Sequence, residues 1–212
     1  MRNRDGDYYE IELNLSDVLE GSGIEEVFYL RDLRQRKLFI NGEIDQFSVA
    51  EVSKHIMQFN KEDRGIDVEK RQPILLYVTS NGGDVDAGFG LIDVILNSKT
   101  PVYTINLAFQ YSMGFLIGLA GHKRYAAKYS KFLMHDGFNF AAGTSTKVQD
   151  EMAFRKKEEA RIKEYVVSRS NITSKEYDKK LRVEWYLFAD EAKERGFTDC
   201  IIGEDCDMDE II

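Results

Sequence analysis

The segment PILLYVTSNGGDVDAGFGLIDVILNS, residues 73–98, joins an apolar run to an amphipathic pattern through Asn-Gly-Gly. Residues 73–80 form a short apolar run between a proline and this turn, which predicts a buried strand. Residues 84–98 repeat apolar side chains at helical spacing from Val85 to Ile95, which predicts a helix. A buried strand followed directly by a helix is typical of a sheet that helices cover.

The same pattern returns downstream. PVYTINLAF (101–109) predicts a second strand, and residues 112–120 predict a second helix. RYAAK (124–128) and KFLMHDG (131–137) predict two further short strands. Strands that alternate with helices of this length indicate β-α-β units, so we expect an α/β protein with a largely parallel sheet.

Five further elements are predicted outside this central region. KLFING (37–42) predicts a short strand closed by Asn-Gly, residues 47–60 predict a helix, and residues 191–202 predict a short helix, a glycine stop and a final strand. Residues 147–170 predict a long, charged helix with a thin apolar stripe. Such a helix buries little by itself, so it either projects into solvent or packs against another copy of the chain.

The composition is that of one globular domain with two short extensions. The chain has 212 residues, 43% of them hydrophobic, which is enough for a substantial core. We expect a charged and partly irregular N-terminal segment (1–35), one domain (36–203) and an acidic C-terminal tail (204–212). The formal charge of -8 argues against nucleic acid or an anionic membrane as the main partner, because both favour a basic surface.

The cysteines and the apolar runs predict a cytoplasmic protein. Cys200 and Cys206 are too few for a disulfide framework or a zinc knuckle, so we expect ordinary thiols in a reducing compartment. The first ten residues lack the apolar core of a secretory signal, and no run reaches the roughly 18 residues that cross a bilayer. There is no Walker loop, no GxGxxG and no HExxH, so the sequence does not indicate nucleotide or metal catalysis.

One serine and one histidine are candidates for catalysis. Ser112 opens the apolar stretch 112–120, where a serine is commonly a helix cap. As a nucleophile it would instead need a base, and the chain has three histidines. His55 lies within a predicted helix, where a structural role is expected, and His122 lies in a turn, where we expect it in solvent. His135 ends a predicted strand, at a sheet edge where active-site groups of open α/β sheets gather.

Two strand-to-helix junctions offer backbone amides for an oxyanion. In TSNGGD (79–84), glycines allow close approach to a ligand and a helix start adds partial positive charge. The junction at Ser112 adds the amide of Met113. The sequence around the serine, QYSMG, differs from the GxSxG elbow of α/β-hydrolases, which disfavours that fold.

The order of the motifs resembles one known family. NGGDVDAGFGLID, SMG, KRYA, SKFLMH and EAKERGFTD follow one another as in the proteolytic subunit of the Clp protease (ClpP), a serine peptidase with a crotonase-like spiral fold. The resemblance extends from about Lys37 to Ile202 and is specific because several separated motifs agree. It implies an α/β spiral of β-β-α units from which a long handle helix protrudes.

Carried over by position, the family's catalytic groups fall on five residues of this chain. The nucleophile falls on Ser112, the base on His135, and the oxyanion hole on the amides of Gly83 and Met113. The acid falls on Glu184, where the family has aspartate. A glutamate can also orient an imidazole. Asp136 and Asp190 are less favoured substitutes for this acid.

The resemblance also implies activity, partners and assembly. Such subunits cleave unfolded proteins and peptides inside a chamber made of two stacked heptameric rings, without a metal or organic cofactor. ATP is used only by a separate partner, an AAA+ unfoldase ring. Two alternatives remain open: a catalytically inactive ring subunit of the same fold, and a crotonase-type acyl-CoA enzyme.

Overall fold

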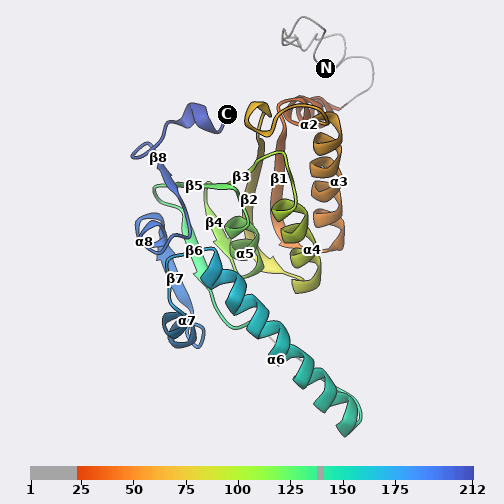
Figure 1. Ribbon diagram of the computed structural model, residues 1–212, viewed down its shortest axis with the longest axis vertical. Coiled ribbons are helices and arrows are strands. Elements are labelled where there is room, and N and C mark those ends of the chain that lie inside the picture. The colour runs from red at the N-terminus through yellow and green to blue at the C-terminus, as the bar shows by residue number, and fades with distance from the viewer. Residues whose placement is uncertain (1–22, 138–140) are drawn as a thin grey trace, which may run out of the picture. The chain divides into compact units, whose positions relative to one another are not determined.

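The computed structural model describes residues 23–137 and 141–212 (Figure 1). Within these residues an eight-stranded sheet has the order β7-β6-β4-β2-β3-β5-β8, with β1 beside β2. The strands are β1 (Lys37–Ile44), β2 (Ile74–Gly83), β3 (Val102–Asn106), β4 (Phe109–Tyr111), β5 (Lys123–Ala127), β6 (Lys131–Met134), β7 (Trp185–Phe188) and β8 (Cys200–Ile202). Each neighbouring pair among β6, β4, β2, β3, β5 and β8 is parallel, and β7 is antiparallel to β6. This largely parallel sheet confirms the predicted α/β class.

The described residues also form seven α-helices. They are α2 (Ile24–Arg34), α3 (Gln46–Glu62), α4 (Val85–Leu96), α5 (Met113–Leu119), α6 (Ser145–Ser168), α7 (Ser174–Lys180) and α8 (Ala189–Glu194), with 3-10 turns η1 (Val68–Lys70) and η2 (Met208–Glu210). The chain divides into two compact units, residues 1–37 and 38–212. The helix α2 lies in the first unit, and α3 to α8 lie in the second.

The strand β2 is the centre of the second unit. It pairs with β3 on one side and with β4 on the other, and α5 packs on it and against α4. Its apolar residues from Ile74 to Val78 are buried on both faces, as a continuous apolar run predicts. The strand continues through Asn81 to Gly83, so the Asn-Gly-Gly motif lies within a strand rather than in a separate turn.

Several elements differ from the sequence predictions. The predicted strand 101–109 is two strands, because β3 pairs with β5 whereas β4 pairs with β6. Within the segment 1–35, Ile24–Arg34 is the helix α2, where no helix was expected, and residues 1–22 lie outside the described part. The sequence also does not predict α7 and β7. They have only seven and four residues, and elements this short show little periodicity.

The prediction of two free thiols was wrong, because Cys200 and Cys206 form a disulfide. The chain reverses after β8 at Gly203, whose positive φ of 84° suits glycine, and the Gly203 amide donates to the Cys206 carbonyl at 2.8 Å. This reversal lays Cys206 beside the strand that carries Cys200. The sequence spacing alone did not reveal the reversal.

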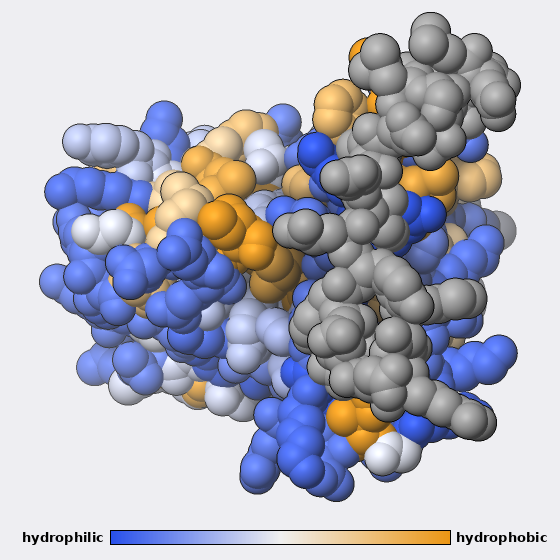
Figure 2. Space-filling view, turned by 90° about the horizontal axis from the view of Figure 1, so that it is seen from above, coloured by the Kyte–Doolittle hydropathy of each residue, from blue (hydrophilic) through white to orange (hydrophobic). Residues whose placement is uncertain are grey.

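The long charged helix was predicted over residues 147–170 and is α6. It extends away from the sheet in Figure 1, and only its last turns contribute a buried side chain, Val166. On its projecting part Met152 and Phe154 are exposed. Seen from above, most of the surface is hydrophilic, with apolar surface gathered in limited areas (Figure 2). No helix in residues 23–137 and 141–212 combines the length and the apolarity that crossing a bilayer requires.

Candidate active site

Ser112 joins β4 to α5 in a strained backbone conformation. Its φ of 53° and ψ of -121° lie outside the regions that non-glycine residues favour, at a cost on the order of 1–3 kcal/mol. Its amide donates to the Leu133 carbonyl at 2.9 Å, which ties the junction to β6. Its side chain makes no capping hydrogen bond to α5. The helix-cap explanation of this serine therefore fails, and its hydroxyl is left for another role.

The glycine motif at the end of β2 packs directly against this junction. A Cβ on Gly82 would lie 2.7 Å from the Ser112 Cβ and 3.1 Å from the Met113 nitrogen, so only a glycine allows this approach. Ser80 is paired with Gln110 across β2 and β4, which brings the two strand-to-helix junctions to the same edge of the sheet. The Met113 amide opens α5, where the first amides have no partner within the helix.

Gly83→Ala is expected to lower the free energy of unfolding by about 3 kcal/mol. Gly83 has a φ of 150°, and an added Cβ would stand 2.2 Å from the Ile44 carbonyl oxygen, a backbone atom that cannot move aside cheaply. The matched control is Gly90→Ala, because Gly90 lies inside α4 with open space at its Cβ, and alanine there should stabilise by about 0.5–1 kcal/mol. Urea denaturation of both variants measures the difference. Equal midpoints for the two variants would contradict the tight contact at Gly83.

His135 and Glu184 meet where β6 and β7 pair. These strands are antiparallel with Met134 opposite Trp185, so the residue after β6 and the residue before β7 are neighbours. His135 Nδ1 lies 3.0 Å from Glu184 Oε1. The His135 side chain is 24% exposed and that of Glu184 57%. Of the three acids considered from the sequence, Glu184 is the one that hydrogen-bonds His135 in the part of the chain that the structure describes.

Ser112, Met113 and His135 line one cavity of about 520 Å³. Residues of α5, α6 and α7, together with Val85 of α4, form much of the remaining wall. The structure thus brings the candidate nucleophile, one candidate amide and the candidate base to the same space, with Glu184 behind the base. Gly83 is not part of the lining, although its neighbour Gly82 touches Ser112.

One face of α6 lines this cavity with residues that the sequence alone does not assign to a site. Arg155, Glu158, Ile162 and Val166 line the cavity and are spaced three or four residues apart. Residues with this spacing share one side of a helix. The helical period could have identified this face, but only the fold shows that it is turned toward Ser112.

The bulky residues before the serine do not enter the cavity. The Gln110 side chain is buried and packs on α5, where its Oε1 would lie 2.1 Å from a Cβ on Gly118. Tyr111 stacks edge-on against Tyr186 of β7, with ring centroids 5.8 Å apart. Burial raises the pKa of the Tyr111 hydroxyl. Both side chains therefore support the β4–α5 junction from outside the cavity.

The other two histidines have structural surroundings. His55 lies partly buried on α3, with its ring 6.5 Å from that of Phe59. His122 is exposed, as expected, but its Nδ1 accepts a hydrogen bond from the Val102 amide at 3.1 Å. Burial of this edge of the ring lowers the pKa of His122.

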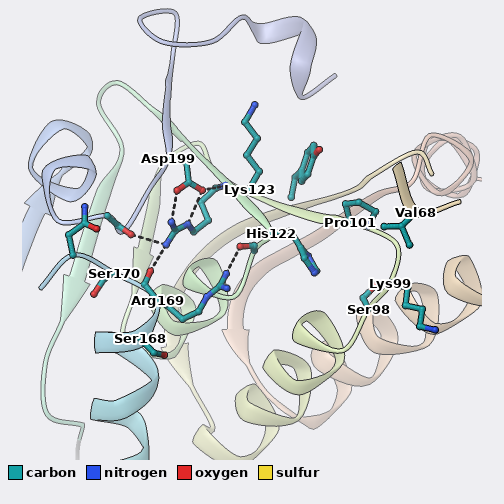
Figure 3. A pocket seen from close by; sticks show the side chains of 15 residues that line it. Val68, Ser98, Lys99, Pro101, His122, Lys123, Ser168, Arg169, Ser170 and Asp199 are labelled. Atoms are coloured by element: carbon teal, nitrogen blue, oxygen red, sulfur yellow. Dashed lines mark hydrogen bonds and ion pairs between the residues drawn. The ribbon is translucent and has the colours of Figure 1, made fainter. Parts of the chain in front are cut away.

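A larger cavity of about 970 Å³ lies apart from the serine (Figure 3). Its cationic groups hold the fold together. Arg124 forms an ion pair with Asp199 and donates to two backbone carbonyls, and Arg169 donates to three carbonyls at the end of α5. Because these donors are already engaged, this cavity is a weaker candidate for catalysis than the one that Ser112 lines.

Comparison with known proteins gives consistent matches. A family model described as Clp protease matches residues 24–205. The ATP-dependent Clp protease proteolytic subunit 2 of Treponema pallidum is 28% identical over 186 residues, which cover 87% of this chain and 90% of that protein. Subunit 1 of Corynebacterium jeikeium is 29% identical over 180 residues (82% and 90%), and subunit 2 of Corynebacterium efficiens is 28% identical over 196 residues (90% and 94%). The family match spans every candidate site residue from Gly83 to Glu184.

Proposed function

Because this chain belongs to the Clp protease family, we propose that it is a serine endopeptidase with Ser112 as nucleophile and His135 as general base. The observation that carries the proposal is the 3.0 Å contact between His135 Nδ1 and Glu184 Oε1, at a cavity that Ser112 also lines. A carboxylate can only accept, so Nδ1 donates its hydrogen to Glu184. Nε2 then keeps a lone pair with which to accept the serine proton.

The reaction follows from these groups. Ser112 Oγ attacks the peptide carbonyl while His135 Nε2 takes its proton. The amides of Gly83 and Met113 donate to the oxyanion of the tetrahedral intermediate. The protonated His135 then gives its proton to the leaving amine, and an acyl-enzyme remains on Ser112. Water, deprotonated by His135, attacks the acyl carbon; the bond to Ser112 Oγ breaks, His135 returns its proton to Oγ, and the second product leaves. Throughout, the Glu184 carboxylate holds the ring and stabilises its charged form, and no metal or organic cofactor is required.

We further propose that the chain works in a ring assembly in the cytoplasm. Two stacked heptameric rings would enclose the serines, and an AAA+ unfoldase would deliver unfolded proteins. The exposed Met152 and Phe154 on the projecting part of α6 support a contact with another copy. A head-to-tail ring would also bury heterologous surfaces that a monomer exposes.

Labelling with a fluorophosphonate tests the catalytic proposal. The full-length protein is incubated with the reagent, and the adduct is mapped by mass spectrometry. We expect modification of Ser112 that is lost in His135→Ala, because the hydroxyl reacts only when a base takes its proton. Absence of labelling in an assembled ring would favour the inactive subunit instead. Labelling that persists in His135→Ala would exclude His135 as the general base that activates Ser112.

A further inference from the structure

Four residues from neighbouring strands form one row on a face of the sheet. Tyr77 of β2 is opposite Ile105 of β3, Ile105 is opposite Tyr125 of β5, and Tyr125 is opposite Cys200 of β8. Residues directly opposite one another share a face of a sheet. All four are buried in one hydrophobic cluster. We call these four residues the apolar row.

The C-terminal residues 203–212, here called the strap, are fastened to both ends of the apolar row. At one end Cys206 is bonded to Cys200. At the other end the Tyr77 hydroxyl donates to the Ile211 carbonyl, and the Ile211 side chain is 1% exposed within the same cluster. The strap therefore crosses from the edge strand β8 back over β5 and β3 to β2.

A polar contact holds the middle of the strap. Glu210 accepts from Lys123 Nζ at 2.6 Å and from the Tyr125 hydroxyl at 2.9 Å. Both hydrogen bonds lower the pKa of the Glu210 carboxyl, and the one from Lys123 has the larger effect. In Figure 3 the side chain of Lys123 points toward the C-terminal segment.

Two more ion pairs secure the turn at the start of the strap. Lys128 contacts Glu204 at 2.8 Å, and Lys193 contacts Asp205 at 2.5 Å. Exposed ion pairs such as these each contribute little, since water and salt screen them. Without the disulfide, the strap would be held by the Ile211 side chain, by hydrogen bonds from Tyr77, Tyr125 and the Ile201 amide, and by the exposed ion pairs.

The disulfide acts directly on the attachment of the strap to β8. Its cysteines are six positions apart, and a disulfide that closes a short loop restricts the unfolded chain less than one that closes a long loop. Its main physical effect is local, because it fixes the start of the strap against β8. The two sulfurs would also stay close together after reduction, which favours reversible closure.

We propose that the strap is a redox-released cover of the apolar row. A dithiol reductant breaks the Cys200–Cys206 bond: each sulfur gains one electron and one proton, and the reductant becomes a disulfide. The strap then detaches and exposes Tyr77, Ile105 and Tyr125. This surface would be continuous with Phe39, which is already 46% exposed and stacks on Tyr77 at 4.8 Å. The proposal does not depend on the peptidase activity.

Hydrogen exchange on the full-length protein tests this proposal. Samples are compared before and after treatment with dithiothreitol, and again after reoxidation with oxidised glutathione. We expect exchange of amides in residues 203–212 to rise about tenfold or more on reduction and to return on reoxidation. Binding of an apolar dye should rise in parallel, because the apolar row becomes exposed.

Two variants sharpen the test. Cys200→Ser with Cys206→Ser should show fast exchange in the strap with or without reductant. Glu210→Gln should speed exchange of the strap in reduced protein and leave it slow in oxidised protein, because the disulfide then carries the attachment. Unchanged exchange on reduction would overturn the proposal. Finding two free thiols in the native protein by mass spectrometry under non-reducing conditions would overturn it as well.

Discussion

Ser112→Ala should lower kcat for hydrolysis of a short fluorogenic peptide by a factor on the order of 10³–10⁶. The variant removes the only atom that we expect to attack the carbonyl and leaves the oxyanion amides in place. The fold should survive, because the serine hydroxyl makes no capping hydrogen bond. Peptide hydrolysis and thermal unfolding, measured on the same preparations, separate loss of chemistry from loss of structure.

Ser112→Gly is the matched control for the backbone at this position. It also lacks the hydroxyl, but glycine adopts a φ of 53° without the penalty that alanine has there. We therefore expect the glycine variant to be as inactive as the alanine variant, and to melt at the same temperature or higher. Substantial hydrolysis by Ser112→Ala would exclude this serine as the nucleophile. A glycine variant clearly less stable than the alanine variant would contradict the strain at Ser112.

Glu184→Gln should lower kcat by a factor on the order of 10²–10⁴. A neutral amide no longer stabilises the imidazolium of His135, and it can donate to Nδ1 and so favour the wrong tautomer. The carboxylate is 57% exposed, so the loss of one charge should cost little global stability. Peptide hydrolysis under saturating substrate measures the effect, because the change acts on the transition state.

Two neighbouring acids serve as controls for Glu184. Asp136 follows His135 directly in the chain, and Asp190 lies in the first turn of α8. Asp136→Asn and Asp190→Asn should each leave kcat within about twofold, because the hydrogen bond to His135 comes from Glu184. Glu184→Asp keeps the charge but shortens the side chain, so it should fall between wild type and Glu184→Gln. Equal losses in all three neutral variants would leave Glu184 without a special role.

Local sequence patterns predict individual elements of the fold but not the contacts of the candidate catalytic residues. The apolar run 73–80 and the helical spacing of 84–98 predicted β2 and α4 correctly, because strand burial and helix amphipathicity are local properties. Ser112 and His135 were assigned from their positions at element ends and from the resemblance of the motifs. Their hydrogen bonds, strain and common cavity belong to the folded chain.

Local sequence patterns predict the α/β class and the main alternation of strands and helices, and they supply the residue types available for catalysis. Which distant groups meet depends on the fold. The antiparallel pairing of β6 with β7 places Glu184 on His135, although 49 positions separate them. The reversal after β8 joins Cys200 to Cys206 and lays the strap over three strands. These contacts depend on sheet register and chain reversal, which arise from packing of the whole domain and leave no periodic trace in the sequence.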